Sequence, residues 1–509
     1  MRLLLFRGRS AISKTTVKRN VLNLTSNFLK YLLLATSALY ILSYIVIALL
    51  RIRYPFELEW LEGGVLEHVR RILEGKKLFV APSIEFVTFI YTPLHYYVSA
   101  LAAKITGLSF FPLRLVSLLS SLGSFFIIYL IVKKETQSRF AGVVATGLFA
   151  ATFRLSAFWF DIGRADSLFI FLLLVTIYLI RFEISIISYV LAGVLVSLSF
   201  LTKQTALVIS LPIMLYAILS NWRRSIFFVG TAIALIFGST VFFDRISDGW
   251  FIYYIYKLPS YHAITKSMIL GFWTKDIFPK LAIAFVASLL YIFALLAKPD
   301  KKALLFYLLV GAGMVGGAWF TRLNWASYPN VLMPAHAMIA ILFGLATHKI
   351  SEGLLLEKQV SIKICIYLIC LIQFALLIYN PFRQVPPRAD MEAGKQLVNT
   401  IAQYDGNVFI PSHGYLAAMA GKNSYAHAMV LIDLLIHDKG PIGKKLFHEI
   451  RQAINEQKFS AIILDNKKFF QYDTDKFYKK SGPVFQDKNV FWPVTGARNR
   501  PEFIYVPKE

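Results

Sequence analysis

Charged residues are scarce in this sequence. Asp, Glu, Lys and Arg make up 16% of the 509 residues, whereas soluble proteins carry about 25%. Apolar side chains make up 57%, and apolar runs of roughly 18 residues or more recur along the first three quarters of the chain. This pattern excludes an ordinary soluble domain and predicts an all-α polytopic membrane protein.

Cysteine and acidic residues are also few. The two cysteines, Cys365 and Cys370, lie in one apolar run, which excludes a disulfide framework and a cysteine-based zinc site. The 29 acidic residues are outnumbered by 54 basic ones. The basic residues are scattered between apolar runs, which is typical of loops at an anionic lipid surface and speaks against nucleic-acid binding. The sequence has no internal repeat, which counts against repeat-built transporters.

Eleven apolar runs are predicted to span the membrane. They cover residues 29–50, 112–132, 140–158, 167–180, 185–202, 205–220, 226–243, 277–297, 303–320, 330–347 and 364–380. Residues 92–106 are apolar but short and carry Lys104, so we interpret them as interfacial. With this interpretation all basic clusters fall on one side of the membrane. The positive-inside rule then predicts a cytoplasmic N-terminus and an outer C-terminus.

This topology divides the chain into three parts. Residues 1–28 form a basic cytoplasmic N-terminus, residues 29–380 the transmembrane domain, and residues 381–509 a small extracytoplasmic α/β domain. Within the last part we expect helices at 390–403 and 441–457 and strands at 407–410 and 460–464. The transmembrane domain carries two large outer loops, 52–111 and 244–276.

The first outer loop is predicted to contain two amphipathic helices at the membrane surface. Residues 61–74 place their apolar side chains on one stripe, and Gly75 ends the helix. A second helix begins near Pro93, which is favourable in a first helical turn.

Acidic and basic side chains gather at the predicted outer ends of the spans. They are Glu57, Glu59, Glu62, Asp161, Arg164, Asp166, Lys203, Gln204 and Arg322. Charges inside a membrane are costly, so their convergence at one depth from several helices indicates a polar site above the bundle. The tail histidines His413 and His427 are instead interpreted as surface or locally satisfied residues.

Several segments carry a family resemblance. They are, in order, Glu62-Gly63, VRRILEGKKLFVAP, FIYTPLHYYVSALAAKITG, RLVSLLSSLG, Gly163-Arg164-Ala165-Asp166-Ser167-Leu168 and Leu201-Thr202-Lys203-Gln204-Thr205. The sequence thereby resembles the membrane glycosyltransferases of the GT-C superfamily, such as the protein O-mannosyltransferases and the lipid A aminoarabinose transferases. The tail, with PSHGYLAAMAGK, resembles the tails of bacterial members.

The resemblance implies an inverting glycosyltransferase that takes a sugar from a polyprenyl-phosphate donor at the outer membrane face. In the family an acidic residue of the first outer loop is the general base, and many members have Asp-Glu there. This chain has Leu61-Glu62. Glu62 is therefore the predicted base, Glu59 is a substitute, and Glu57 is left open.

The remaining polar residues suit the other needs of such a reaction. A leaving phosphate requires positive charge and hydrogen-bond donors. The predicted donor-phosphate residues are Arg164, Lys203, Gln204 and Arg322. Asp166 is expected to orient Arg164 or to contact the sugar or acceptor, and three residues are expected to bind substrate: Tyr91, His95 and Asp161. No cofactor is required, and a divalent metal is left open.

Other functions are alternatives to sugar transfer. One is a transporter or flippase, and the other a ligase or polymerase, for lipid-linked glycans; ionisable residues at the span ends rather than the midplane count against the transporter. The acceptor is a glycan, a lipid or a protein. The end of the chain, Val-Pro-Lys-Glu, carries no retention signal. Together with the tail resemblance this favours a bacterial plasma (inner) membrane.

Overall fold

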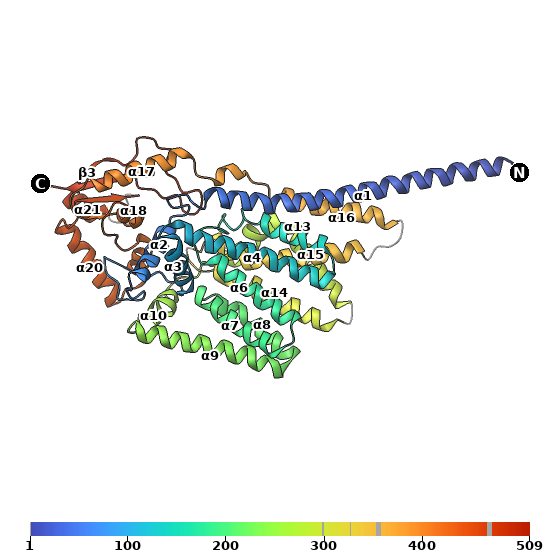
Figure 1. Ribbon diagram of the computed structural model, residues 1–509, viewed down its shortest axis with the longest axis horizontal. Helices are drawn as coiled ribbons and strands as arrows, with labels where there is room; N and C mark the ends of the chain where they lie inside the picture. The colour runs from blue at the N-terminus through green and yellow to red at the C-terminus, as the bar shows by residue number, and fades with distance from the viewer. Residues whose placement is uncertain (1, 298–299, 326, 353–357, 466–470) are drawn as a thin grey trace.

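A computed structural model describes residues 2–297, 300–325, 327–352, 358–465 and 471–509. Most of the chain forms a bundle of long helices, and a small domain with a β-sheet lies against one end of this bundle (Figure 1). The long helices are α1 (Arg2–Arg51), α4 (Phe110–Thr136), α5 (Arg139–Ala151), α6 (Asp166–Phe182), α7 (Ile186–Thr202), α8 (Ala206–Ser220), α9 (Trp222–Ile246), α13 (Phe278–Leu296), α14 (Lys301–Arg322), α15 (Met333–Glu352) and α16 (Lys358–Ala375). Each predicted span therefore corresponds to a helix.

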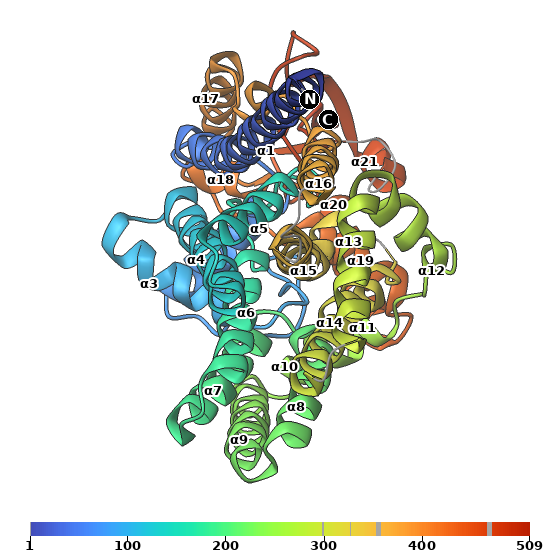
Figure 2. The ribbon, with the colours of Figure 1, turned by 90° about the vertical axis from the view of Figure 1, so that its right-hand side faces the viewer.

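The bundle has the surface of a multi-pass membrane protein. Six described helical stretches are long and apolar enough to cross a membrane: Arg19–Arg51, Phe110–Thr136, Trp222–Ile246, Met268–Leu296, Lys301–Arg322 and Pro329–Ser351. Helix α9 leaves Phe237 and Ile233 more than half exposed, as expected where the neighbour is lipid. Helix α15 lies near the middle of the bundle (Figure 2) and is almost wholly buried. The count of eleven spans stays a prediction.

Two segments differ from their predicted bounds. Helix α1 begins at Arg2 and projects beyond the bundle (Figure 1), so the basic N-terminal segment is helical. The predicted span 140–158 is too long, because α5 ends at Ala151. The chain then turns through Ala157 and Phe158, which both have positive φ, near +60°. This turn brings the segment before α6 back over the end of the bundle.

The first outer loop contains both expected helices, α2 (Glu62–Leu73) and α3 (Leu94–Thr106). Gly75, with φ +69°, follows α2, as predicted. The start of α2 is buried against protein, since a Cβ on Gly63 would lie 2.3 Å from the ring of Tyr415 in the C-terminal domain. Helix α2 is therefore covered by that domain. Helix α3 has 13 residues, as α5 does, and both are shorter than the roughly 20 residues of a typical transmembrane helix.

The second outer loop consists of short helical turns at the same end of the bundle. They are α10 (Trp250–Ile252), η1 (Tyr253–Lys257), α11 (Leu258–Ser260), α12 (Met268–Gly271) and η2 (Phe272–Ile277), and η3 (Pro329–Leu332) lies before α15. Phe251 and Tyr254 join an apolar cluster with the first outer loop and the C-terminal domain. The outer loops and the tail therefore share one core, separate from that of the bundle.

The C-terminal region contains a four-stranded mixed sheet in the order β1-β2-β4-β3. Its elements are η4 (Pro381–Gln384), α17 (Arg388–Ala402), β1 (Val408–Phe409), α18 (Gly414–Met419), α19 (Ala428–His437), α20 (Pro441–Asn455), β2 (Ala461–Leu464), α21 (Gln471–Phe477), β3 (Tyr478–Pro483) and β4 (Phe503–Pro507). Strands β1 and β2 are parallel, whereas β4 runs antiparallel to β2 and β3. The two helices and two strands expected in this region are all present.

Candidate active site

A cavity of about 450 Å³ lies between the outer end of the bundle and the C-terminal region. Its walls come from the first and second outer loops, the segment before α6, the α7–α8 junction, the end of α14, the segment before α15, helix α19 and the tail. The polar or aromatic residues that line it are Glu59, Trp60, Tyr91, Trp159, Arg164, Lys203, Gln204, Thr205, His262, Thr321, Asn324, Trp325, Ser327, Tyr328, Asn330 and Asp433. Five of the predicted site residues are among them.

Glu59 lies in the cavity wall and is fully buried. Its Oε2 accepts hydrogen bonds from the backbone N–H of Leu61 and from Nη1 of Arg164, both at 3.2 Å. Its Oε1 has no hydrogen-bond partner among the described residues. Burial raises the pKa of Glu59 to about 8, although the charge of Arg164 lowers it. Glu59 thus combines a free oxygen with raised proton affinity.

Arg164 is held by aromatic neighbours as well as by Glu59. Its Nη2 donates a hydrogen bond to the Tyr91 hydroxyl at 3.0 Å. The guanidinium carbon lies 4.9 Å from the ring centre of Trp159 and 5.3 Å from that of Tyr91. These contacts hold the cation in place at the cavity wall, so Arg164 presents a fixed positive charge.

Lys203 supplies a second cation. Its Nζ donates to Oδ1 of Asp166 at 2.6 Å, and the same oxygen accepts a hydrogen bond from Asn330 at 2.8 Å. Asp166 therefore hydrogen-bonds to Lys203 and Asn330, and its expected contact with the sugar or acceptor stays a prediction. The neighbouring Gln204 donates to the carbonyl of Ile90 at 2.7 Å while lining the cavity.

Glu62 has entirely different surroundings. Its carboxylate forms a bidentate pair with Arg114 at 3.0 and 2.7 Å, and both side chains are fully buried. It also accepts backbone hydrogen bonds from Leu58 and Gly163 at 2.7 and 2.6 Å. Burial raises the pKa of Glu62, but Arg114 and these donors outweigh that effect and lower it. Glu62 does not line the cavity. Its contacts are those of a buried ion pair that connects the first outer loop to α4.

Glu57 points toward the C-terminal region. Its Oε1 accepts a hydrogen bond from Gly63 N–H at 2.9 Å, and its Oε2 lies 2.5 Å from Nδ1 of His413. The other nitrogen of His413 lies 3.2 Å from Asp465. Burial lowers the pKa of His413, but the two carboxylates raise it to about 10. The interpretation of His413 as a surface or locally satisfied histidine misses this link, and His427 is also buried.

Three other predicted site residues lie outside the cavity. Asp161 forms a buried pair with Arg51 at 2.7 Å, and Arg322 forms a partly buried pair with Asp276 at 2.8 Å. His95 is buried behind the wall, with no hydrogen-bond partner within the described part of the chain. Burial lowers the pKa of His95 to about 4, so it is neutral at neutral pH.

Sequence reasoning missed several residues of the site. Arg114 carried a usable signal, because it is a lone cation inside a predicted span, and such a residue requires a partner. Tyr328 and Asn330, at the start of another span, had no distinctive pattern. Near the chain's end, Thr495 donates from its N–H to the Leu58 carbonyl at 3.2 Å, and Tyr328 donates to the carbonyl of Gly496 at 3.1 Å. This tail segment covers Glu59, and no local sequence signal indicates it.

Residues 91–243 match a family model described as dolichyl-phosphate-mannose-protein mannosyltransferase. The structure of ArnT from Cupriavidus metallidurans in the apo state aligns with a TM-score of 0.60 at 12% identity, over 92% of this chain and 97% of that one. The same protein bound to undecaprenyl phosphate aligns with a TM-score of 0.57 at 11% identity, over the same shares. No curated protein sequence matches this chain.

A more distant structure shares the fold. It is the archaeal oligosaccharyltransferase AglB from Archaeoglobus fulgidus in complex with an inhibitory peptide and a dolichol-phosphate, with a TM-score of 0.50 at 11% identity, over 86% of this chain and 70% of that one. The structural matches show that the chain shares the fold of these proteins. The match of residues 91–243 to the mannosyltransferase family model supports the resemblance to GT-C glycosyltransferases found in the sequence.

Proposed function

We propose that the protein transfers a sugar from a polyprenyl-phosphate donor to an acceptor hydroxyl, with Glu59 as the general base. Glu59, Arg164 and Lys203 line the same cavity, and Oε1 of Glu59 has no hydrogen-bond partner among the described residues. This combination of one free carboxylate oxygen and two fixed cations is the observation that carries the proposal. Glu62, the residue expected from the sequence, is assigned a structural role instead.

In this reaction the acceptor oxygen attacks the anomeric carbon as its proton passes to Oε1 of Glu59. The bond between that carbon and the phosphate oxygen breaks, and polyprenyl phosphate leaves with the electron pair. A base of this kind accelerates transfer by typically 10²–10⁴-fold. Attack opposite the leaving group inverts the sugar carbon.

Arg164 and Lys203 stabilise the negative charge that develops on the leaving phosphate. Arg164 offers a planar donor pair and Lys203 a point charge. Asp166 and Asn330 position Lys203 through the 2.6 and 2.8 Å hydrogen bonds at Oδ1. Gln204 and Tyr91 line the same wall and are assigned to donor and substrate binding.

An apolar groove of about 510 Å³ supports a prenyl donor. It is lined by residues of α8 and α9, among them Leu207, Met214 and Ile233, and by Tyr256. Leu207 follows closely on Thr205, which lines the polar cavity. A lipid chain in the groove would therefore place its phosphate at the cavity. Two of the similar solved structures contain undecaprenyl phosphate and a dolichol-phosphate, which belong to the class of lipid carrier proposed for the donor of this chain.

The test is transfer by purified protein from a panel of radiolabelled polyprenyl-phosphate sugars, with a membrane extract as acceptor source. We expect transfer from one donor by the wild type, and a loss of about 10²–10⁴-fold in Glu59→Gln with donor binding retained. The control is Glu74→Gln, an exposed carboxylate in the same outer loop, which should retain full activity.

Two results would overturn the proposal. Unchanged transfer by Glu59→Gln would remove Glu59 as the base. An absence of transfer and hydrolysis from every donor, with intact donor crossing liposomes instead, would establish a flippase.

A further inference from the structure

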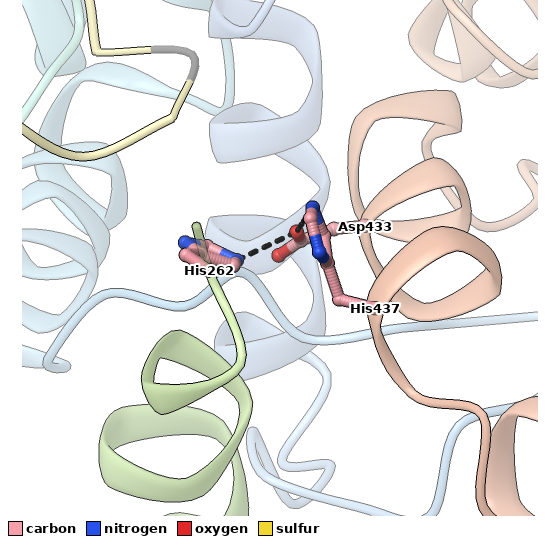
Figure 3. A group of neighbouring side chains, drawn as sticks. All are labelled: His262, Asp433 and His437. Carbon is pink, nitrogen blue, oxygen red and sulfur yellow. Dashed lines mark hydrogen bonds and ion pairs between the residues drawn. The ribbon is translucent and has the colours of Figure 1, made fainter. Parts of the chain in front are cut away.

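His262, Asp433 and His437 meet at the edge of the cavity (Figure 3), and none of them takes part in the proposed transfer. His262 lies in the second outer loop, whereas Asp433 and His437 lie on helix α19. We propose that these three residues form a binding site for one divalent cation of the zinc class, which ties the C-terminal region to the outer loop.

The geometry is that of a converging ligand set. Nε2 of His262 lies 2.7 Å from Oδ1 of Asp433, and Nε2 of His437 lies 3.8 Å from the same oxygen. One ligand atom from each residue lies within 4.8 Å of the others. With metal bonds of about 2.0–2.2 Å, tetrahedral ligand atoms lie about 3.4 Å apart, so small side-chain rotations suffice to enclose an ion.

Helix α19 explains how two of the ligands come together. Asp433 and His437 are four residues apart, so they occupy one face of the helix, one turn above the other. The ring of Trp325 packs against His437 with centroids 5.0 Å apart. This contact holds His437 in place, and His262 completes the ligand set from the outer loop.

Two ligand atoms remain without hydrogen-bond partners among the described residues. They are Oδ2 of Asp433 and Nε2 of His437, and both are buried. The Asp433 side chain is only 7% exposed. Unpaired buried polar atoms are costly, and a single cation bound by both residues would satisfy them.

The donor set selects the kind of ion. Two imidazoles and one carboxylate suit Zn²⁺, whereas Mg²⁺ and Ca²⁺ prefer oxygen ligands. Three protein ligands leave a fourth tetrahedral position for water. Because His262 and Asp433 also line the cavity, this water would lie at its edge. The inference concerns binding alone and does not depend on the proposed transfer reaction.

The test is a zinc titration of full-length protein purified in detergent and stripped with a chelator. We expect one equivalent to bind to the wild type and raise its unfolding temperature. His262→Ala and Asp433→Asn should each lose affinity by about tenfold or more, since loss of outer-shell partners alone costs 10–100-fold. The matched control is His448→Ala, an exposed histidine on α20 of the same region, which should bind as the wild type does.

Equal zinc binding by wild type, His262→Ala and Asp433→Asn would overturn the site. Loss of binding in His448→Ala alone would also overturn it, because the ion would then sit on the surface. If the ligand variants do not fold, Co²⁺ is added to the wild type. Strong visible absorption that Zn²⁺ abolishes supports a tetrahedral site, and a weak octahedral spectrum contradicts it.

Discussion

At the scale of single residues, the three carboxylates Glu57, Glu59 and Glu62 differ by what surrounds them. All three are buried. Glu57 pairs with His413, and Glu62 pairs with Arg114. Only Glu59 keeps an oxygen without a partner among the described residues. The same residue type therefore has three different settings. Glu57 links two regions, Glu59 is the candidate base, and Glu62 forms a buried ion pair.

The raised pKa of Glu59 predicts that the proposed transfer depends on pH. Burial raises this pKa to about 8, and a general base acts only when deprotonated, so kcat/KM should rise with pH and level off above about pH 8. The measurement is kcat/KM for the active donor across this range. The residual activity of Glu59→Gln should lack the rise, and a flat wild-type profile would argue against Glu59.

Glu62→Gln should destabilise the fold. Removing one partner of a buried ion pair leaves an uncompensated charge, here on Arg114, at a cost of about 3–5 kcal/mol. We expect a clear fall in the unfolding temperature of Glu62→Gln and little change for Glu59→Gln. A Glu62→Gln protein that is as stable as the wild type but inactive would restore Glu62 as the base.

At the scale of elements, the tail segment around Gly496 packs closely against Glu59. Gly496 has φ +81°, and a Cβ there would lie 2.5 Å from Cγ of Glu59. The chain can pass this close to the side chain because the residue is glycine. A segment of the C-terminal region, far away in sequence, therefore forms part of the site wall.

Gly496→Ala should displace either Glu59 or the tail segment and reduce kcat at least tenfold. The measurement is transfer from the active donor. Gly482→Ala is the matched control: it lies in the same region, and a Cβ there would meet no atom within 4 Å. Equal activity of the two variants would show that the tail does not position Glu59.

At the scale of the whole molecule, the C-terminal region is linked to the first outer loop through His413. This imidazole faces Glu57 on one side and Asp465 on the other. The link crosses from the sheet region to the loop that carries Glu59. It therefore couples the stability of the tail to the shape of the site.

This link should weaken in alkali. The pKa of His413 is raised to about 10 from an ordinary 6.5, so its stabilisation is complete below about pH 6.5 and is lost as pH rises toward about 10. We expect the unfolding temperature of the wild type to fall over this window by several degrees more than that of His413→Gln. Parallel curves for the two proteins would rule out this role of the ionised pair.

The sequence by itself determined the membrane class, the positions of the helices and the resemblance to GT-C glycosyltransferases. Long apolar runs and basic clusters are local properties, and hydrocarbon permits few backbone structures other than helices. Five site residues that line the cavity were also predicted, because Glu59, Tyr91, Arg164, Lys203 and Gln204 lie near the ends of helices or in outer loops. Their positions along the chain were sufficient to predict that these five residues lie at the same depth in the membrane.

Only the tertiary structure decided which of these carboxylates lines the cavity. Glu59 and Glu62 are three residues apart, and nothing local distinguishes them. Arg114, more than fifty residues away, forms an ion pair with Glu62. Gly496, more than four hundred residues away, packs against Glu59. Proton affinity in a buried site depends on such distant partners and on the exclusion of water, and these exist only after the chain has folded.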